Sequence, residues 1–280
     1  MNLLIALAVF VALGFLLGVL LAVASRVFAV KTDERIPQVL DCLPGANCGG
    51  CGYAGCAAMA EAIVKGDAKP GGCPVSDGEA KNKIASIMGV EASGSVRMRA
   101  QVLCSGTKDL AKKKFLYEGV ADCIAATKLG GGDKLCPNGC IGLGTCAAVC
   151  PFEAIEIHNG VAVVNYHKCQ ACGLCADACP KHLIELIPFD SRVWVGCKSV
   201  DKGAVTRQYC DVGCISCKKC EKTCQHGAIT VTDFVAKINY EKCVQCGDCV
   251  AACPRKIIWS DQKQGQGASI RVGEADVQAE

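Results

Sequence analysis

The sequence is poor in the large side chains that usually fill a protein core. Only 5% of its 280 residues are aromatic, and it has two tryptophans and four histidines. It contains no G-x-G-x-x-G after a predicted strand, no P-loop, and no flavin-attachment or nucleophile motif. We therefore expect no catalytic residue and no nicotinamide or flavin site on this chain.

Charge is absent from the first part of the chain, where the apolar run Leu3–Ala24 is long enough, at 1.5 Å per helical residue, to span a bilayer. Arg26, Lys31 and Arg35 follow, which places the C-terminal side in the cytoplasm by the positive-inside rule. We predict a transmembrane anchor over residues 1–26 rather than a secretory signal peptide, which would have a basic segment before a shorter apolar core. Structural disulfides are rare in the cytoplasm.

Cysteine, by contrast, is abundant. The chain contains 25, a density typical of disulfide scaffolds, zinc proteins or iron–sulfur proteins. Disulfide scaffolds are mostly short secreted chains, whereas this chain is long and its cysteine count is odd. A chain with few large apolar side chains also gains stability from metal centres that tie its loops together. Composition therefore favours metal binding.

The first group of cysteines has the spacing C-x2-C-x4-C-x16-C and consists of Cys48, Cys51, Cys56 and Cys73. Helices are expected over residues 56–66, ending at Gly66, and over residues 76–89. A lone group of four cysteines has no partner run with which to share ligands, so all four should bind one metal centre. The sequence predicts a small α-rich domain over residues 31–90.

The larger part of the chain contains an internal repeat with a constant offset of 74 residues. The cysteines of the first copy are Cys136, Cys140, Cys146, Cys150, Cys169, Cys172, Cys175 and Cys179, and they recur as Cys210, Cys214, Cys220, Cys224, Cys243, Cys246, Cys249 and Cys253. Residues 154–169 align with residues 228–243, and both are typical of a β-hairpin. We expect a duplicated unit over residues 98–190 and 191–260, followed by a polar tail over residues 261–280.

The chemistry of the repeat follows from its spacing. Residues 169–180 and 243–254 have the pattern C-x2-C-x2-C-x3-C-P, and residues 214–224 have it without the proline. This is the bacterial ferredoxin run, in which three cysteines bind one [4Fe–4S] cluster and the fourth binds a second cluster. Zinc is the main rival, although zinc sites usually pair C-x2-C knuckles. The expected fold class is α+β: a transmembrane helix, a small α-rich 4Fe–4S domain, and tandem ferredoxin-like domains of hairpins and short helices.

The ferredoxin rule assigns ligands to four clusters in the two repeats. The second repeat should form one set from Cys214, Cys217, Cys220 and Cys253, and another from Cys243, Cys246, Cys249 and Cys224. In the first repeat Leu143 stands in the position of Cys217, and we expect Cys136 to replace the missing thiol. The predicted sets there are Cys136, Cys140, Cys146 and Cys179, and Cys169, Cys172, Cys175 and Cys150.

The first cysteine group and these four sets make five expected clusters. Five cysteines remain. A sixth cluster from Cys104, Cys123, Cys197 and Cys210 is a further option, and Cys42 has no assigned role.

The apolar N-terminal run, the motif "CLPGANCGGCGYAGC" and the tandem repeats together resemble the B subunit of the Rnf complex, an ion-translocating ferredoxin:NAD oxidoreductase. The resemblance covers nearly the whole chain, which departs from shorter members in having two ferredoxin-like units. By position, it carries the family's first-domain ligands to Cys48, Cys51, Cys56 and Cys73. It implies an electron-transfer subunit that accepts electrons from reduced ferredoxin and passes them to membrane subunits. The complex would move Na⁺ or H⁺, while another subunit reduces NAD.

The partners implied are reduced ferredoxin, the other membrane and peripheral subunits, and the membrane itself, with no nucleic acid. The implied location is the inner, cytoplasmic membrane, with the cysteine-rich domains on the cytoplasmic side. Two other classes of function stay open at this point. One is a polyferredoxin subunit of a different membrane oxidoreductase, such as a hydrogenase or a quinone-reducing complex. The other is a zinc-stabilised scaffold.

Overall fold

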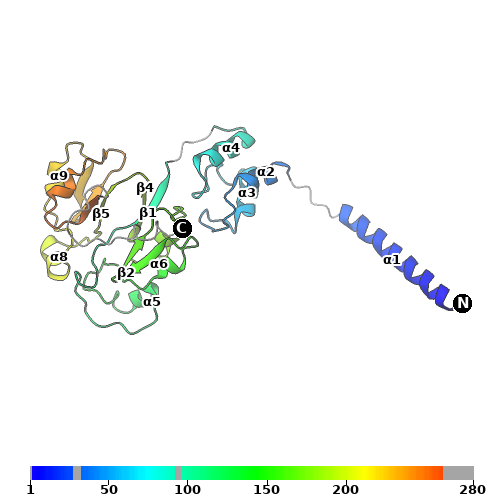
Figure 1. Cartoon of the computed structure of the whole chain (residues 1–280), viewed down its shortest axis with the longest axis horizontal. Coiled ribbons are helices and arrows are strands. Elements are labelled where there is room, and N and C mark those ends of the chain that lie inside the picture. Colours follow the sequence, from blue (N-terminus) through cyan, green and yellow to red (C-terminus); the bar gives the residue numbers. More distant parts are fainter. Residues whose placement is uncertain (1, 28–32, 92–95, 261–280) are drawn as a thin grey trace, which may run out of the picture.

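The computed structural model describes residues 2–27, 33–91 and 96–260 (Figure 1). A first helix, α1 (Asn2–Val27), precedes a small helical unit, and two larger units follow, each with two short antiparallel sheets. The expected polar tail over residues 261–280 lies outside the described residues.

The predicted transmembrane anchor over residues 1–26 is contradicted. Residues 2–27 do form α1, but among the described residues no helix is both long and apolar enough to cross a membrane. For the described residues, the fold class is therefore corrected to α+β without a transmembrane helix.

The small unit consists of three helices, α2 (Arg35–Cys42), α3 (Cys56–Lys65) and α4 (Gly78–Met88). The sequence correctly predicted α3 and α4. Helix α3 ends because Gly66 adopts a φ of 88°, and its N–H donates to the carbonyls of Ala62 and Ile63. The three helices enclose one core, whose largest fully buried members are Val39, Met59, Ile63 and Ile84. The cysteine-rich loop 43–55 joins α2 to α3 and packs against this core through Cys51 and Tyr53.

Unit 1 begins after residue 95 and has seven elements: β1 (Met98–Val102), α5 (Cys123–Lys128), α6 (Thr145–Ala148), β2 (Ile155–His158), β3 (Val161–Val164), α7 (Leu174–Asp177) and β4 (Ile184–Pro188). Strands β2 and β3 form the hairpin that the sequence predicts. A second sheet pairs β1 with β4, with Met98 opposite Pro188 and Val102 opposite Ile184. This pairing closes the unit, because it joins its first strand to its last.

Unit 2 repeats the plan with β5 (Val193–Val195), α8 (Gly203–Tyr209), α9 (Lys219–Thr223), β6 (Ile229–Thr232), β7 (Val235–Ile238), α10 (Asp248–Ala252) and β8 (Ile258–Ser260). The hairpin β6–β7 was predicted, and β5 pairs with β8 as β1 pairs with β4. The backbone repeats in detail: Ala171 and Gln245, 74 residues apart, both lie in the left-handed region, with φ of 53° and 61°.

The cores of both units are small and contain cysteine. In unit 1 the buried cluster combines short side chains such as Ala100, Val161 and Ala162 with Cys146, Cys169 and Cys175. In unit 2 the buried members include Val193, Val235, Cys214 and Cys220. The cysteines are therefore part of each core, and what they bind contributes to the stability of the unit.

Candidate metal centres

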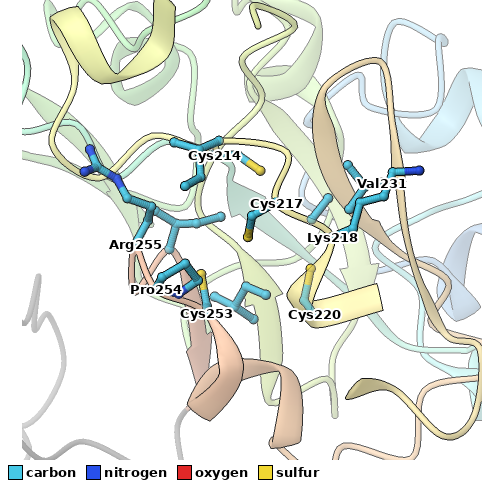
Figure 2. Close-up of a pocket in the computed structure, with 12 residues that line it drawn as sticks. Cys214, Cys217, Lys218, Cys220, Val231, Cys253, Pro254 and Arg255 are labelled. Carbon is cyan, nitrogen blue, oxygen red and sulfur yellow. The ribbon is translucent and has the colours of Figure 1, made fainter. Parts of the chain in front are cut away.

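One cavity of unit 2 is surrounded by four of the predicted ligands (Figure 2). Cys214, Cys217 and Cys220 come from the loop before α9 and from its first turn, and Cys253 comes from the end of α10. Their thiols face a shared space of about 330 Å³, partly open to solvent, whose wall includes Val231, Ile257 and Pro254. The structure thus brings together all four members of this predicted set.

Two further cavities also match predicted sets. Cys224, Cys243, Cys246 and Cys249 line a space of about 370 Å³ in unit 2. Cys150, Cys169, Cys172 and Cys175 line a space of about 310 Å³ in unit 1. In each case three cysteines belong to one run and the fourth to the other, which is the exchange expected of a ferredoxin-like unit.

The first cysteine group lies at the edge of the small unit. Cys73 is buried in its core, and Cys51 and Cys56 pack against the same core. Asn47 helps to shape the loop, because its Oδ1 accepts a hydrogen bond of 2.8 Å from the Cys56 N–H. On the outer side of the loop, Gly50 lies so close to unit 1 that a Cβ there would be 2.5 Å from the Cys172 carbonyl oxygen. The loop of the first group therefore contacts the loop that carries Cys172.

In unit 1 the structure separates Cys136 from the partners that the sequence assigned to it. Cys136 lines a different cavity, of about 380 Å³, together with Cys104, Cys197 and Cys210. The neighbours whose charges act on Cys146 are instead Cys123, Cys179 and Cys175. Cys123 is the first residue of α5, where its N–H donates to Thr145 Oγ1 at 2.7 Å. It therefore lies beside α6, the helix that contains Cys146.

A signal in the sequence could have pointed to Cys123 as the cysteine that joins Cys146. Cys104 and Cys136 are 32 residues apart, whereas Cys197 and Cys210, their structural counterparts, are 13 residues apart. The extra segment carries Cys123 and occurs only in the copy that has Leu143 in place of a cysteine. Loss of one thiol and gain of another in the same unit is the pattern of a replaced ligand.

Backbone amides point at several of the candidate ligand sulfurs. The N–H groups of Ala154 and Ala228 donate to Cys150 Sγ and Cys224 Sγ, each at 3.4 Å and at equivalent positions of the repeat. Leu183 donates in the same way to Cys179 Sγ. Donors of this kind stabilise thiolates and tune the potential of iron–sulfur sites.

Burial strongly affects the acidity of these thiols. It is the main reason that the pKa of Cys146, Cys175 and Cys220 is raised to about 12, with repulsion from neighbouring thiolates adding to the effect. At Cys224 the effect of burial is outweighed by several backbone N–H donors, led by that of Ala228, and the pKa of this thiol is lowered. Because the pKa of Cys146, Cys175 and Cys220 is raised in this way, metal binding at these three thiols must release their protons.

The geometry suits a cluster better than a single ion. In the described ranges, no three side chains of the His, Cys, Asp and Glu types come close enough together to hold one metal ion. The thiols line cavities that are partly open to solvent, whereas a zinc site draws four ligands to within about 2.3 Å of one point. Four thiols around such a space, with amides directed at their sulfurs, are the donor set of a [4Fe–4S] cluster.

Known protein families match the same three regions. Residues 43–75 match a family described as "Putative Fe-S cluster". Residues 133–180 and 213–257 each match a family described as "4Fe-4S dicluster domain". Together with the thiol-lined cavities of a duplicated ferredoxin-like unit, these matches define an iron–sulfur electron-transfer protein.

The relatives identify the family. The chain is 43% identical to the B subunit of the Na⁺-translocating ferredoxin:NAD⁺ oxidoreductase complex of Acetobacterium woodii, over 91% of this chain and 77% of the relative. It is 45% identical to the B subunit of the ion-translocating oxidoreductase complex of Methanosarcina acetivorans (90% and 96%), and 38% identical to that of the proton-translocating ferredoxin:NAD⁺ oxidoreductase complex of Clostridium ljungdahlii (89% of each). The chain belongs to this family, the B subunits of Rnf-type complexes, as the sequence predicted, and it is an iron–sulfur electron-transfer subunit of such a complex.

Proposed function

We propose that this subunit takes electrons from reduced ferredoxin and delivers them to other subunits of an ion-translocating oxidoreductase complex. The observation that carries the proposal is the succession of cysteine sets through unit 2, unit 1 and the small unit. A chain with one isolated site could bind a cluster for stability alone. A row of neighbouring sites is what electron transfer over a distance requires.

Five sets form the proposed pathway. They are Cys48, Cys51, Cys56 and Cys73 in the small unit; Cys150, Cys169, Cys172 and Cys175, and Cys123, Cys140, Cys146 and Cys179, in unit 1; and Cys214, Cys217, Cys220 and Cys253, and Cys224, Cys243, Cys246 and Cys249, in unit 2. A bound [4Fe–4S] cluster takes up and releases one electron at a potential set by hydrogen bonding, charge and exposure. In the third set Cys123 stands in place of the predicted Cys136. Cys123 is a neighbour of Cys146, whereas Cys136 lines another cavity.

The chain's own residues bring these sets close together. Cys146 and Cys175 belong to different sets of unit 1 and are close enough for their charges to interact. The charge of Cys48 likewise acts on Cys172, and Gly50 lets the two loops approach. The exit proposed for electrons is therefore the small unit, which follows the N-terminal helix in the chain. At the other end of the row, Cys246 and the neighbouring Val244 are exposed, which suits a loop that meets a protein donor.

The nature of the complex comes from its relatives. Two of them are named for ferredoxin:NAD⁺ oxidoreductase activity, one with Na⁺ and one with protons as the translocated ion. We assign NAD reduction to a different subunit and leave the ion to the membrane subunits. Because translocation needs a membrane, we propose that this chain works at the cytoplasmic face of the inner membrane as part of the assembled complex.

The proposal is tested by Cys51→Ala in the assembled complex, with Cys42→Ala as the matched control. Cys51 belongs to the proposed exit set, whereas Cys42 is a half-buried cysteine of the same unit with no assigned ligand role. We expect reduced ferredoxin still to bleach the visible absorption of the ferredoxin-like units in C51A, while NAD reduction is lost. The control should keep both. Ferredoxin-dependent NAD reduction that survives C51A at the control rate would refute the pathway.

A further inference from the structure

We propose that Cys104, Cys136, Cys197 and Cys210 bind a sixth [4Fe–4S] cluster at the junction of units 1 and 2. The proposal rests on the proposed function in one respect only, namely that the other cysteine sets also hold clusters. It differs from the option raised by the sequence, because Cys136 takes the place of Cys123.

The four thiols come from both units and line one cavity. Cys104 follows β1 and Cys136 precedes the altered run of unit 1, while Cys197 follows β5 and Cys210 follows α8. The cavity has a volume of about 380 Å³ and is also lined by Gly106, Gly139, Gly196 and Gly213. It is as large as the cavities of the ferredoxin-like sets and has the same number of thiols.

The site repeats across the junction in a way that chance burial of cysteines would not produce. The Cys140 N–H donates to Cys104 Sγ at 3.4 Å, and the Cys214 N–H donates to Cys197 Sγ at 3.3 Å. Cys140 and Cys214 are equivalent residues of the repeat, as are Cys136 and Cys210. Each unit therefore contributes the same two elements: one thiol after its first strand and one before its cysteine run.

Backbone pairing fixes the two halves of the site to each other. The Lys112 N–H donates to the Tyr209 carbonyl and the Asp211 N–H donates to the Leu110 carbonyl, both at 2.8 Å, on either side of a bridge between Ala111 and Cys210. At another point Trp259 Nε1–H of unit 2 donates to Ser105 Oγ of unit 1 at 2.9 Å. The ligands are thus held in place by the fold rather than by flexible loops.

A buried positive charge faces this cavity. Lys134 lines it, is only 4% exposed, and donates from Nζ to the carbonyls of Gly106 and Gly160 at 2.6 and 2.9 Å. Within the described part of the chain, no carboxylate lies within ion-pair distance of this ammonium group. A buried cation without a counter-charge is destabilising, whereas a cluster bound by four thiolates carries the negative charge that Lys134 requires.

The site also completes the row of sites. Its ligand Cys104 accepts a hydrogen bond from Cys140 of unit 1, and its ligand Cys197 accepts one from Cys214 of unit 2. Both donors belong to neighbouring cysteine sets. Each unit has two proposed cluster sites of its own. A cluster in this cavity, which is lined by cysteines of both units, would connect the two pairs of sites.

The test is the iron and acid-labile sulfide content of the anaerobically reconstituted full chain. Six sites predict about 24 irons per chain, and five predict about 20. Two double variants then identify the ligands, because a pair of lost thiols prevents a cube from forming. Both C104A/C197A and C136A/C210A should lose about four irons each, since each pair removes two ligands of the same site.

Other outcomes contradict the proposal in distinguishable ways. If Cys123 rather than Cys136 belonged to the junction site, C136A/C210A would damage two clusters and lose clearly more iron than C104A/C197A. If the four thiols were only buried apolar groups, the native chain would contain about 20 irons and C104A/C197A would lose none. C42A is the control and should keep the full content. Loss of far more than four irons together with loss of far-UV circular dichroism would indicate misfolding, and the count on the native chain then decides. This result is independent of electron delivery in C51A, so the two proposals can fail separately.

Discussion

Units 1 and 2 share a backbone plan but differ at one ligand position and in one loop. Unit 2 has the complete run with Cys217, whereas unit 1 has Leu143 at that place and the longer segment that carries α5 and Cys123. Unit 1 is also contacted at Cys172 by the small unit, while the equivalent Cys246 of unit 2 is exposed. With the proposed ligand sets, unit 1 keeps a second cluster because the inserted segment that carries Cys123 supplies the thiol that Leu143 lacks.

The comparison predicts the largest effect for Cys217→Leu, which copies the unit 1 residue into unit 2. Unit 2 has no cysteine between Cys197 and Cys210, so it has no counterpart of Cys123 to replace the thiol removed. We expect this set to lose its cluster, at a cost of up to about four irons per chain. Iron analysis and the visible absorption measure the loss. Val244→Leu, an exposed change in the next loop, is the control, and an unchanged iron content in C217L would show that this thiol is not a ligand.

A rescue experiment examines the same comparison from the side of unit 1. Cys123→Ala should remove the iron of one cluster in that unit, up to about four atoms. Adding Leu143→Cys restores the run found in unit 2 and should return most of the iron, because the new thiol occupies the position equivalent to Cys217. Leu143→Ala in the same background is the matched control and should restore nothing. Failure of both to restore iron would indicate that Cys123 acts through its packing beside α6.

A smaller effect, confined to electron transfer, is expected at the contact that only unit 1 makes. Gly50→Val would place a Cβ about 2.5 Å from the Cys172 carbonyl oxygen and so force the two loops apart. The iron content should stay unchanged, while NAD reduction by the assembled complex slows severalfold. Gly78→Val is the control, since nothing lies within 4 Å of a Cβ at that position. Equal rates in the two variants would argue that electrons do not cross this contact.

The cysteine runs allowed much of the fold to be predicted from the sequence, because their spacing is imposed by the geometry of the cluster. The hairpins β2–β3 and β6–β7 and the helices α3 and α4 followed from local patterns, and the structure contains all four. The sheets β1–β4 and β5–β8 were not predicted. Their strands have three to five residues and pair across more than 60 positions of the chain, so neither alternation nor turn chemistry announces them.

The same long-range pairing explains why Cys136 lines a different cavity from the one that its predicted partners would share. Cys136 precedes Cys140 closely in the sequence, and this proximity favoured a shared site. The positions at which β1 and β5 end determine instead which cysteines lie near Cys136. Cys104 and Cys197 follow those two strands, and only the assembled sheets show that their sulfurs meet Cys136 and Cys210. The predicted transmembrane anchor was wrong for a different reason, since it rested on composition and length alone.

The division of the junction ligands between the two units has a consequence for biosynthesis. A chain is made from its N-terminus, and domains generally fold as they emerge. The ligands of the small unit are complete once Cys73 has been made, but the junction site needs Cys104 and Cys136 from one unit and Cys197 and Cys210 from the other. Its metal centre can therefore be inserted only after both units have been synthesised and have docked. Insertion of the junction cluster is therefore a late step in maturation, and a chain truncated before Cys210 lacks a ligand for it.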